Sequence, residues 1–161
     1  MRIAIFSAAA GLAVAATPVV AQTISSASYV MKAGAGDLYE RESSRIVLQT
    51  TANSGLKRFA QMMERDHSKS TAEVKKAALM AGVHPKPPKL TPEQARNIAA
   101  LRASSGADRD MLYISQQKAA HQDALALHQA EAASGRSKPL PIVASKIVPV
   151  VQHHIEMLNK M

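Results

Sequence analysis

The stretch 62-MMERDHSKS-70 places a histidine in the apolar stripe of a predicted helix. Counted in helical steps of three and four residues, His67 shares a face with Leu56, Met63 and Val74. An imidazole on such a face is expected to be buried, and its ring nitrogens then need partners. The stretch therefore predicts a helix that packs in a core and carries a polar group into it.

The remainder of the chain also has a helical composition, because Ala, Leu, Met, Gln, Lys and Glu dominate and strand-like runs are few. We expect long helices and one short helix over approximately 24–51, 54–82, 92–103, 108–131 and 141–159. The residues Met31, Leu38, Ile46 and Val47 give the first of these helices its apolar side.

Several residues mark the expected helix ends. Asn53 or Ser54 can cap the second helix. Thr91 and Gln94 have the spacing of a capping box, with a proline directly after the threonine. Gly106 is expected to end the short helix, and Pro149, which lacks a backbone donor, could bend the last one.

The long helices are joined by tight turns except for one long connection, which runs from Gly82 to Gly106 and carries the short helix. A bundle with a single long crossover is typical of ferritin-like proteins. We therefore predict an all-α, ferritin-like four-helix bundle, with the short extra helix in its crossover.

The first 21 residues have the pattern of a cleaved signal peptide, with Arg2 followed by an apolar run and small residues before Gln22. Cleavage after Ala21 removes 21 of 161 residues and leaves a single domain over 22–161. We expect a periplasmic or secreted bacterial protein with no transmembrane span after cleavage; retention of the segment as an anchor is the alternative.

Composition excludes several classes of function. The chain has no cysteine, so disulfides and thiol chemistry are excluded. Its formal net charge of +8 would suit anionic components of the cell envelope, although scattered basic residues also simply solvate helix faces. Aromatic residues are only 3% of the chain, which argues against a nucleic-acid partner.

Histidines on other helices fall at a similar height to His67. His121 and His154 lie on the apolar faces of the last two helices, at comparable distances from the turn between them. Glu42 and Glu64 are each 11 residues from Asn53 in the first hairpin. We predict a metal site from His67, His121, His154, Glu42 and Glu64, with Glu40 and Asp110 as lesser candidates.

Imidazole and carboxylate ligands together suit iron, zinc or copper, and Glu64 and His67 form a Glu-x-x-His pair on one helix face. The alternative is that the histidines are structural, each hydrogen-bonded to an acidic residue such as Asp66 or Asp110. No nucleophile elbow or phosphate-binding glycine loop is found, so no catalytic residue and no enzymatic reaction are predicted.

The other histidines are expected at the surface: His84 in a loop, and His128 and His153 at the edges of the apolar stripes. The methionines Met62, Met63, Met111 and Met157 have ordinary core spacing.

The chain resembles the bacterial domain-of-unknown-function family 4142 in three segments: 35-AGDLYERESSRIVLQTTANSGLKRFAQMMERDHSKSTAEV-74, 104-SSGADRDMLYISQQKAAHQDALALH-128 and 148-VPVVQHHIEM-157. The resemblance implies an exported ferritin-like bundle without an established reaction. It places polar positions at Glu42 or Glu40, Asp66, His67, Asp110, His121 and His154.

A carboxylate-bridged di-iron site needs a second Glu-x-x-His pair. Val151 and Val150 stand three residues before His154 and His153, so this pair is missing. We therefore expect a mononuclear metal site for metal handling or envelope stress. The alternative is an interaction module of the envelope whose buried histidines are structural.

Overall fold

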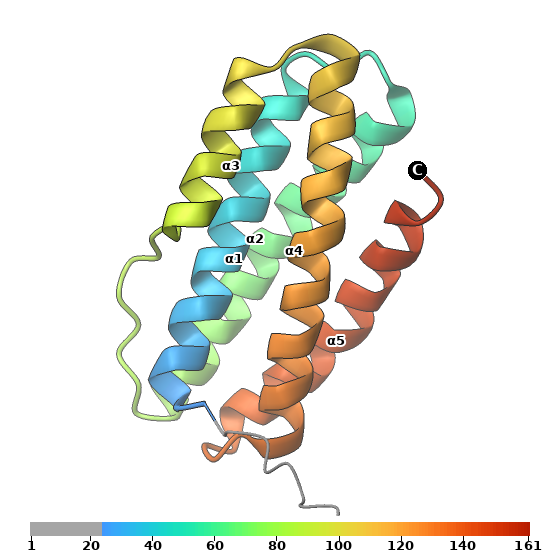
Figure 1. The fold of residues 1–161 in the computed structure, drawn as a ribbon. Helices are drawn as coiled ribbons and strands as arrows, with labels where there is room; N and C mark the ends of the chain where they lie inside the picture. Colours follow the sequence, from blue (N-terminus) through green and yellow to red (C-terminus); the bar gives the residue numbers. More distant parts are fainter. Residues whose placement is uncertain (1–23) are drawn as a thin grey trace, which may run out of the picture.

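The computed structural model describes residues 24–161, and this part of the chain is all-α, without a strand. It has four long helices and the short α3 (Figure 1). The helices are α1 Ser26–Leu48, α2 Ser54–Met80, α3 Pro92–Ala103, α4 Gly106–Ser134 and α5 Pro139–Leu158. The predicted cleavage after Ala21 lies outside the described residues.

The four long helices form a bundle of two hairpins, α1–α2 and α4–α5 (Figure 1). The α1 helix also packs on α4, and α2 packs on α5. The chain rises in α1, descends in α2, returns along the outside through the connection and α3, descends in α4 and rises in α5 (Figure 1). Each helix is therefore antiparallel to both neighbours, as the predicted four-helix bundle with one crossover requires.

Side-chain caps explain where the helices begin. Asn53 Oδ1 accepts from the backbone N–H groups of Gly55 and Leu56 at the start of α2. Thr91 and Gln94 form the predicted capping box of α3. Gly106 does not end α3, which closes at Ser104; instead it opens α4 at a φ of 53° that favours glycine.

The bundle core is divided into two apolar clusters. One cluster, at the end with the α4–α5 turn, contains Tyr29, Val74 and Leu140; the other, toward the α1–α2 turn, contains Phe59 and Leu101. Buried polar residues lie between them along the chain: Asp37 and Glu40 on α1, His67 on α2, Gln117 and His121 on α4, and His154 on α5. Each helix thus changes from apolar to polar and back to apolar at mid-height.

Two methionines predicted to face the core are exposed, Met31 at 67% and Met111 at 62%. Met31 follows the buried Tyr29 and Val30, and its turn of α1 directs it to solvent. Met63 is fully buried, as expected. No helix between residues 24 and 161 is long and apolar enough to span a membrane.

Candidate metal centre

Three histidine rings meet at the centre of the bundle, each from a different helix. His67 comes from α2, His121 from α4 and His154 from α5, and all are at least nine-tenths buried. Their ring centroids are 5.3 to 5.7 Å apart. One nitrogen of each ring lies within 4.8 Å of one nitrogen of both others. The predicted convergence of the three side chains is therefore confirmed.

An aspartate fixes the ring of His67. Its Nδ1 lies 2.9 Å from Oδ1 of Asp37, which is also buried and accepts a further bond from the hydroxyl of Thr71. A carboxylate can only accept, so Nδ1 of His67 carries the proton. Nε2 is then a lone-pair donor for a metal, and within residues 24–161 this buried nitrogen has no hydrogen-bond partner.

Acceptors fix the other two rings in the same way. Nδ1 of His121 lies 2.9 Å from the carbonyl oxygen of Gln117, and Nε2 of His154 lies 3.2 Å from Oδ2 of Asp66. Both nitrogens therefore donate. The remaining nitrogens, Nε2 of His121 and Nδ1 of His154, face each other at 3.3 Å. When both rings are neutral, two lone pairs point at one another.

This geometry fits a metal ion. Imidazole nitrogens lie about 2.0–2.1 Å from zinc, so two ligands of a tetrahedral ion are about 3.3 Å apart. His121 and His154 already have that separation. Hydrogen bonds from the outer ring nitrogen to a carboxylate or carbonyl are the usual support of metal-binding histidines. Here Asp37, Asp66 and the carbonyl of Gln117 provide them.

The surroundings hold two of the rings neutral. Burial, together with the charge of His67, lowers the pKa of His121 to about 3 and that of His154 to about 4. Burial also acts to lower the pKa of His67, but its hydrogen bond to Asp37 and the nearby carboxylates outweigh burial and raise it. Two of the rings thus offer an unprotonated nitrogen that could hold a cation, and His67 would release a proton to do so.

Glu40 is the buried glutamate nearest the histidines. Its Oε1 lies 3.9 Å from Nδ1 of His121, and among residues 24–161 its Oε2 has no hydrogen-bond partner. Burial raises its pKa to about 7, opposed by the nearby charge of His67 and by Gln117. Of the two glutamates on α1 that the sequence offers as inward-facing, Glu40 faces inward and Glu42 does not.

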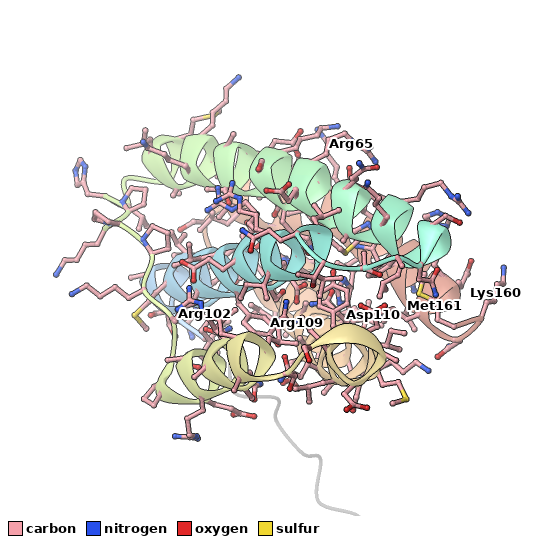
Figure 2. The ribbon with its side chains drawn as sticks, turned by 90° about the horizontal axis from the view of Figure 1, so that it is seen from above. Arg65, Arg102, Arg109, Asp110, Lys160 and Met161 are labelled. Atoms are coloured by element: carbon pink, nitrogen blue, oxygen red, sulfur yellow. The ribbon has the colours of Figure 1, made fainter. Side chains whose placement is uncertain are left out.

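The other predicted carboxylate ligands lie away from the three histidines. Glu64 pairs with Arg45, and Glu42 lies 4.0 Å from Arg102, so both are held at the periphery by arginines. Asp110 lies at the end of the bundle with the α1–α2 turn, where it accepts a bond of 2.8 Å from the Thr51 hydroxyl (Figure 2). The structure brings none of these three to the histidines.

His128 is not at the surface, contrary to the expectation from its place at the edge of the stripe. It is 4% exposed, and its Nδ1 lies 3.0 Å from the hydroxyl of Tyr29, with the two rings edge to face. The tyrosine supplies the polar partner that makes burial possible. His84 and His153 are exposed, as expected.

Sequence reasoning missed Asp37. Its signal was present, because Asp37 and Glu40 are three residues apart on one face of α1. Asp37 also stands 16 residues before Asn53, whereas His67 stands 14 after it, so the two are at nearly the same height.

Comparison with known proteins agrees with this fold. A model of the family described as "Domain of unknown function (DUF4142)" matches residues 9–161, so the chain belongs to this family. No curated protein sequence matches significantly.

Two solved structures are similar. One is a DUF305 fragment from Deinococcus radiodurans, with a TM-score of 0.72 at 14% identity over 84% of this chain and 93% of that one. The other is described as "putative secreted protein DUF305 from Streptomyces coelicolor", with a TM-score of 0.69 at 12% identity over 83% and 87%. At these identities the likeness concerns the fold alone.

Proposed function

We propose that this DUF4142 domain is an exported protein that binds one transition-metal ion through His67, His121 and His154 and acts in metal handling or envelope stress. The ion would be held by Nε2 of His67, Nε2 of His121 and Nδ1 of His154. Positions left open on the metal would be filled by water or a further ligand.

The observation that carries the proposal is that the three rings converge while the outer nitrogen of each faces a hydrogen-bond acceptor. Each outer nitrogen faces an acceptor, so the inner nitrogens of the neutral His121 and His154 rings have lone pairs, and that of His67 gains one when it releases its proton. A purely structural arrangement would need a further proton between His121 and His154. The depressed pKa values of both rings oppose that proton near neutral pH. A metal ion would satisfy the lone pairs of His121 and His154 and replace the inner proton of His67.

The donor atoms favour a divalent ion that binds nitrogen ligands well over an ion that prefers sulfur ligands. The three donors are imidazole nitrogens, and the chain has no cysteine. Asp37, Asp66 and Glu40 place carboxylate groups around the site, which favours a cation there. Iron, zinc and copper remain the candidates.

Export is proposed from the sequence. Residues 1–21 have the pattern of a cleaved signal peptide, which would leave a single domain over 22–161 in the periplasm or medium. One structural neighbour bears the description of a secreted protein, quoted above.

The test compares two neighbouring histidines on α5. The chain from residue 22 is prepared without a histidine tag, stripped of metal, and titrated with Zn²⁺, Cu²⁺ or Fe²⁺ under reducing conditions for iron. His154→Ala should abolish stoichiometric binding. His153→Ala, which changes an exposed ring on the next residue, should bind as the native protein does.

The outcome against the proposal is equally plain. A native protein that binds none of these ions, or an equal loss of binding in both variants, would remove the metal site. Circular dichroism of both variants checks that the bundle is folded.

The alternative function is an interaction module for anionic envelope components. Its support is the basic net charge and a cleft of about 430 Å³ lined by Arg45, Arg102 and Arg109. In that case reversing exposed charges, as in Lys75→Glu with Lys76→Glu, should weaken binding to anionic vesicles of phosphatidylglycerol. His67→Ala should then leave that binding unchanged.

A further inference from the structure

A second cleft, of about 680 Å³, reaches His67 from the side of the bundle formed by α1, α3 and α4. Its lining includes buried Asp37, Glu40 and His67, and exposed Glu93 and Asp123. The exposed residues lie at its mouth and the buried ones at its inner end. This inner end therefore includes the residue whose Nε2 is a proposed ligand.

The charge of this cleft is opposite to that of the protein. Four carboxylate side chains line it, against Lys32 and the His67 ring, whose pKa is raised. The whole chain, in contrast, has a formal net charge of +8. Carboxylates along a cleft with low-dielectric walls concentrate cations and raise their association rate. The approach of a cation to this basic protein is therefore favoured at this cleft.

Glycine at position 36 keeps the cleft open. Gly36 lies inside α1 and lines the cleft, and a Cβ added there would meet no atom within 4 Å. Glycine destabilises a helix interior by about 0.5–1 kcal/mol relative to alanine. No close packing requires it, so its effect here is to leave the wall of the cleft free of a side chain.

The walls of the cleft are also held in place. The Tyr39 hydroxyl donates to Oε1 of Gln116 at 2.9 Å, and Nε2 of Gln116 donates to the carbonyl of Asn97 at 3.3 Å. These bonds join α1, α4 and α3. Phe59 packs against His121 and His154 with ring centroids 6.4 Å away, which adds an apolar contact to these two rings.

Glu40 lies between this cleft and the rings. It lines the cleft, is 4% exposed, and its Oε2 has no hydrogen-bond partner among the residues described. It is outside the group of donor atoms that lie within 4.8 Å of one another. A cation that enters through the cleft would therefore contact the Glu40 carboxylate before the cation reaches the histidines.

We propose that the cleft between α1, α3 and α4 is the access route of a hydrated divalent cation, and that Glu40 transfers the cation from solvent to the three histidines. This inference rests on the proposed function. The exposed carboxylates at the mouth of the cleft attract the cation, and Glu40 passes it inward. The three imidazoles remain the ligands of the bound ion.

The test measures how fast the metal-free protein takes up Co²⁺, whose visible absorption reports binding by imidazole, in a stopped-flow instrument. Gly36→Leu places a bulky side chain in the cleft without changing a polar group, and Gly36→Ala is its matched control. The leucine variant should bind with an association rate reduced by about tenfold or more, at an unchanged Kd, because entry and exit are obstructed together. The alanine variant should behave as the native protein.

Two charge variants test the chemistry of the route. Asp123→Lys at the mouth should slow association by about tenfold at low salt, and the difference should shrink as salt is raised. Glu40→Gln should slow association at every salt concentration and keep one Co²⁺ per chain.

The result that overturns the inference is a Gly36→Leu protein that binds Co²⁺ at the native rate, or a Glu40→Gln protein whose rate is unchanged. The first result would mean that the cation arrives by another path, and the second would mean that Glu40 does not transfer it. Failure of the proposed function has a different signature, since the native protein would then give no Co²⁺ absorption at all.

Discussion

Nε2 of His121 and Nδ1 of His154 lie 3.3 Å apart in the core of the bundle, with a hydrogen-bond acceptor behind each ring. The outer bonds therefore determine what the inner nitrogens can do. A metal ion between the rings would be supported by residues that never touch it. This relationship makes the supporting carboxylates sensitive positions for mutation.

Replacing Asp37 by asparagine should weaken metal binding although every ligand remains. The amide can present its NH₂ group to Nδ1 of His67, which moves the ring proton to the nitrogen that should bind the metal. Loss of such supporting partners typically costs about 10–100-fold in affinity. A competition titration with a chromophoric chelator measures the metal affinity of the variant and of the native protein.

The control is Asp108→Asn, which changes an exposed aspartate in the first turn of α4. Its affinity should equal that of the native protein. An Asp37→Asn protein with native affinity would show that the carboxylate does not orient His67 for binding.

Metal-free protein should lose stability in mild acid. The folded-state pKa of His121 is lowered to about 3, and those of His154 and His128 to about 4, from 6.5. The unfolded chain then binds more protons between about pH 4 and 6.5, so the free energy of unfolding falls as pH decreases through this range. Each such group contributes up to about 1.4 kcal/mol per pH unit.

Glu40 makes the free energy of unfolding change with pH in the opposite direction. Its pKa is raised from 4.5 to about 7, so its contribution is present below pH 4.5 and is lost as pH rises toward 7. The raised pKa of His67 acts in the same direction as Glu40 but changes stability mainly above pH 6.5, so the three other histidines outweigh both groups below that pH. Urea unfolding at pH 4.5, 5.5 and 6.5 measures the slope, which should be steeper in Glu40→Gln. A stability that does not change with pH would contradict these burial effects.

Much of this arrangement could be predicted from the sequence. The helix order, the crossover and the meeting of His67, His121 and His154 followed from apolar periodicity and from counting residues back to each turn. The burial of His128 could not be predicted in this way. It depends on Tyr29, which is 99 residues distant and comes into contact only when α1 packs against α4.

The carboxylates were the least predictable part of the site for a similar reason. Each glutamate on a helix can face a histidine or a surface arginine, and spacing alone does not decide. Glu64 and Glu42 are held by Arg45 and Arg102 at the outside of the bundle, and these pairings depend on tertiary structure.

Tyr29→Phe should destabilise the bundle without affecting metal binding. The change removes the hydroxyl that lies 3.0 Å from Nδ1 of His128 and leaves a buried ring nitrogen without its partner, at a cost of about 1–3 kcal/mol. Chemical denaturation of the metal-free protein at pH 7 measures the loss.

The matched control is Tyr39→Phe. Its hydroxyl bonds to Gln116, which is only partly buried and can turn to water, so the loss should be smaller. Equal losses of stability in the two variants would show that the bond between Tyr29 and His128 contributes no more than the bond between Tyr39 and Gln116.

Asn53→Ala should cost about 1 kcal/mol of stability, because the asparagine caps two backbone N–H groups of α2. Asn159→Ala serves as the control, since Asn159 is exposed after α5 and should change stability by less than about 0.5 kcal/mol. Thermal unfolding of the two proteins side by side gives the comparison. Similar melting temperatures would contradict the capping role.

The three rings come from both hairpins, one from α1–α2 and two from α4–α5. An ion bound to all of them would fasten the hairpins together in a chain that has no cysteine to form a covalent cross-link. Occupancy would then govern how often the hairpins separate and expose cleavable backbone to proteases. The lifetime of the protein in the cell would rise and fall with the supply of the metal, and its abundance would itself report that supply.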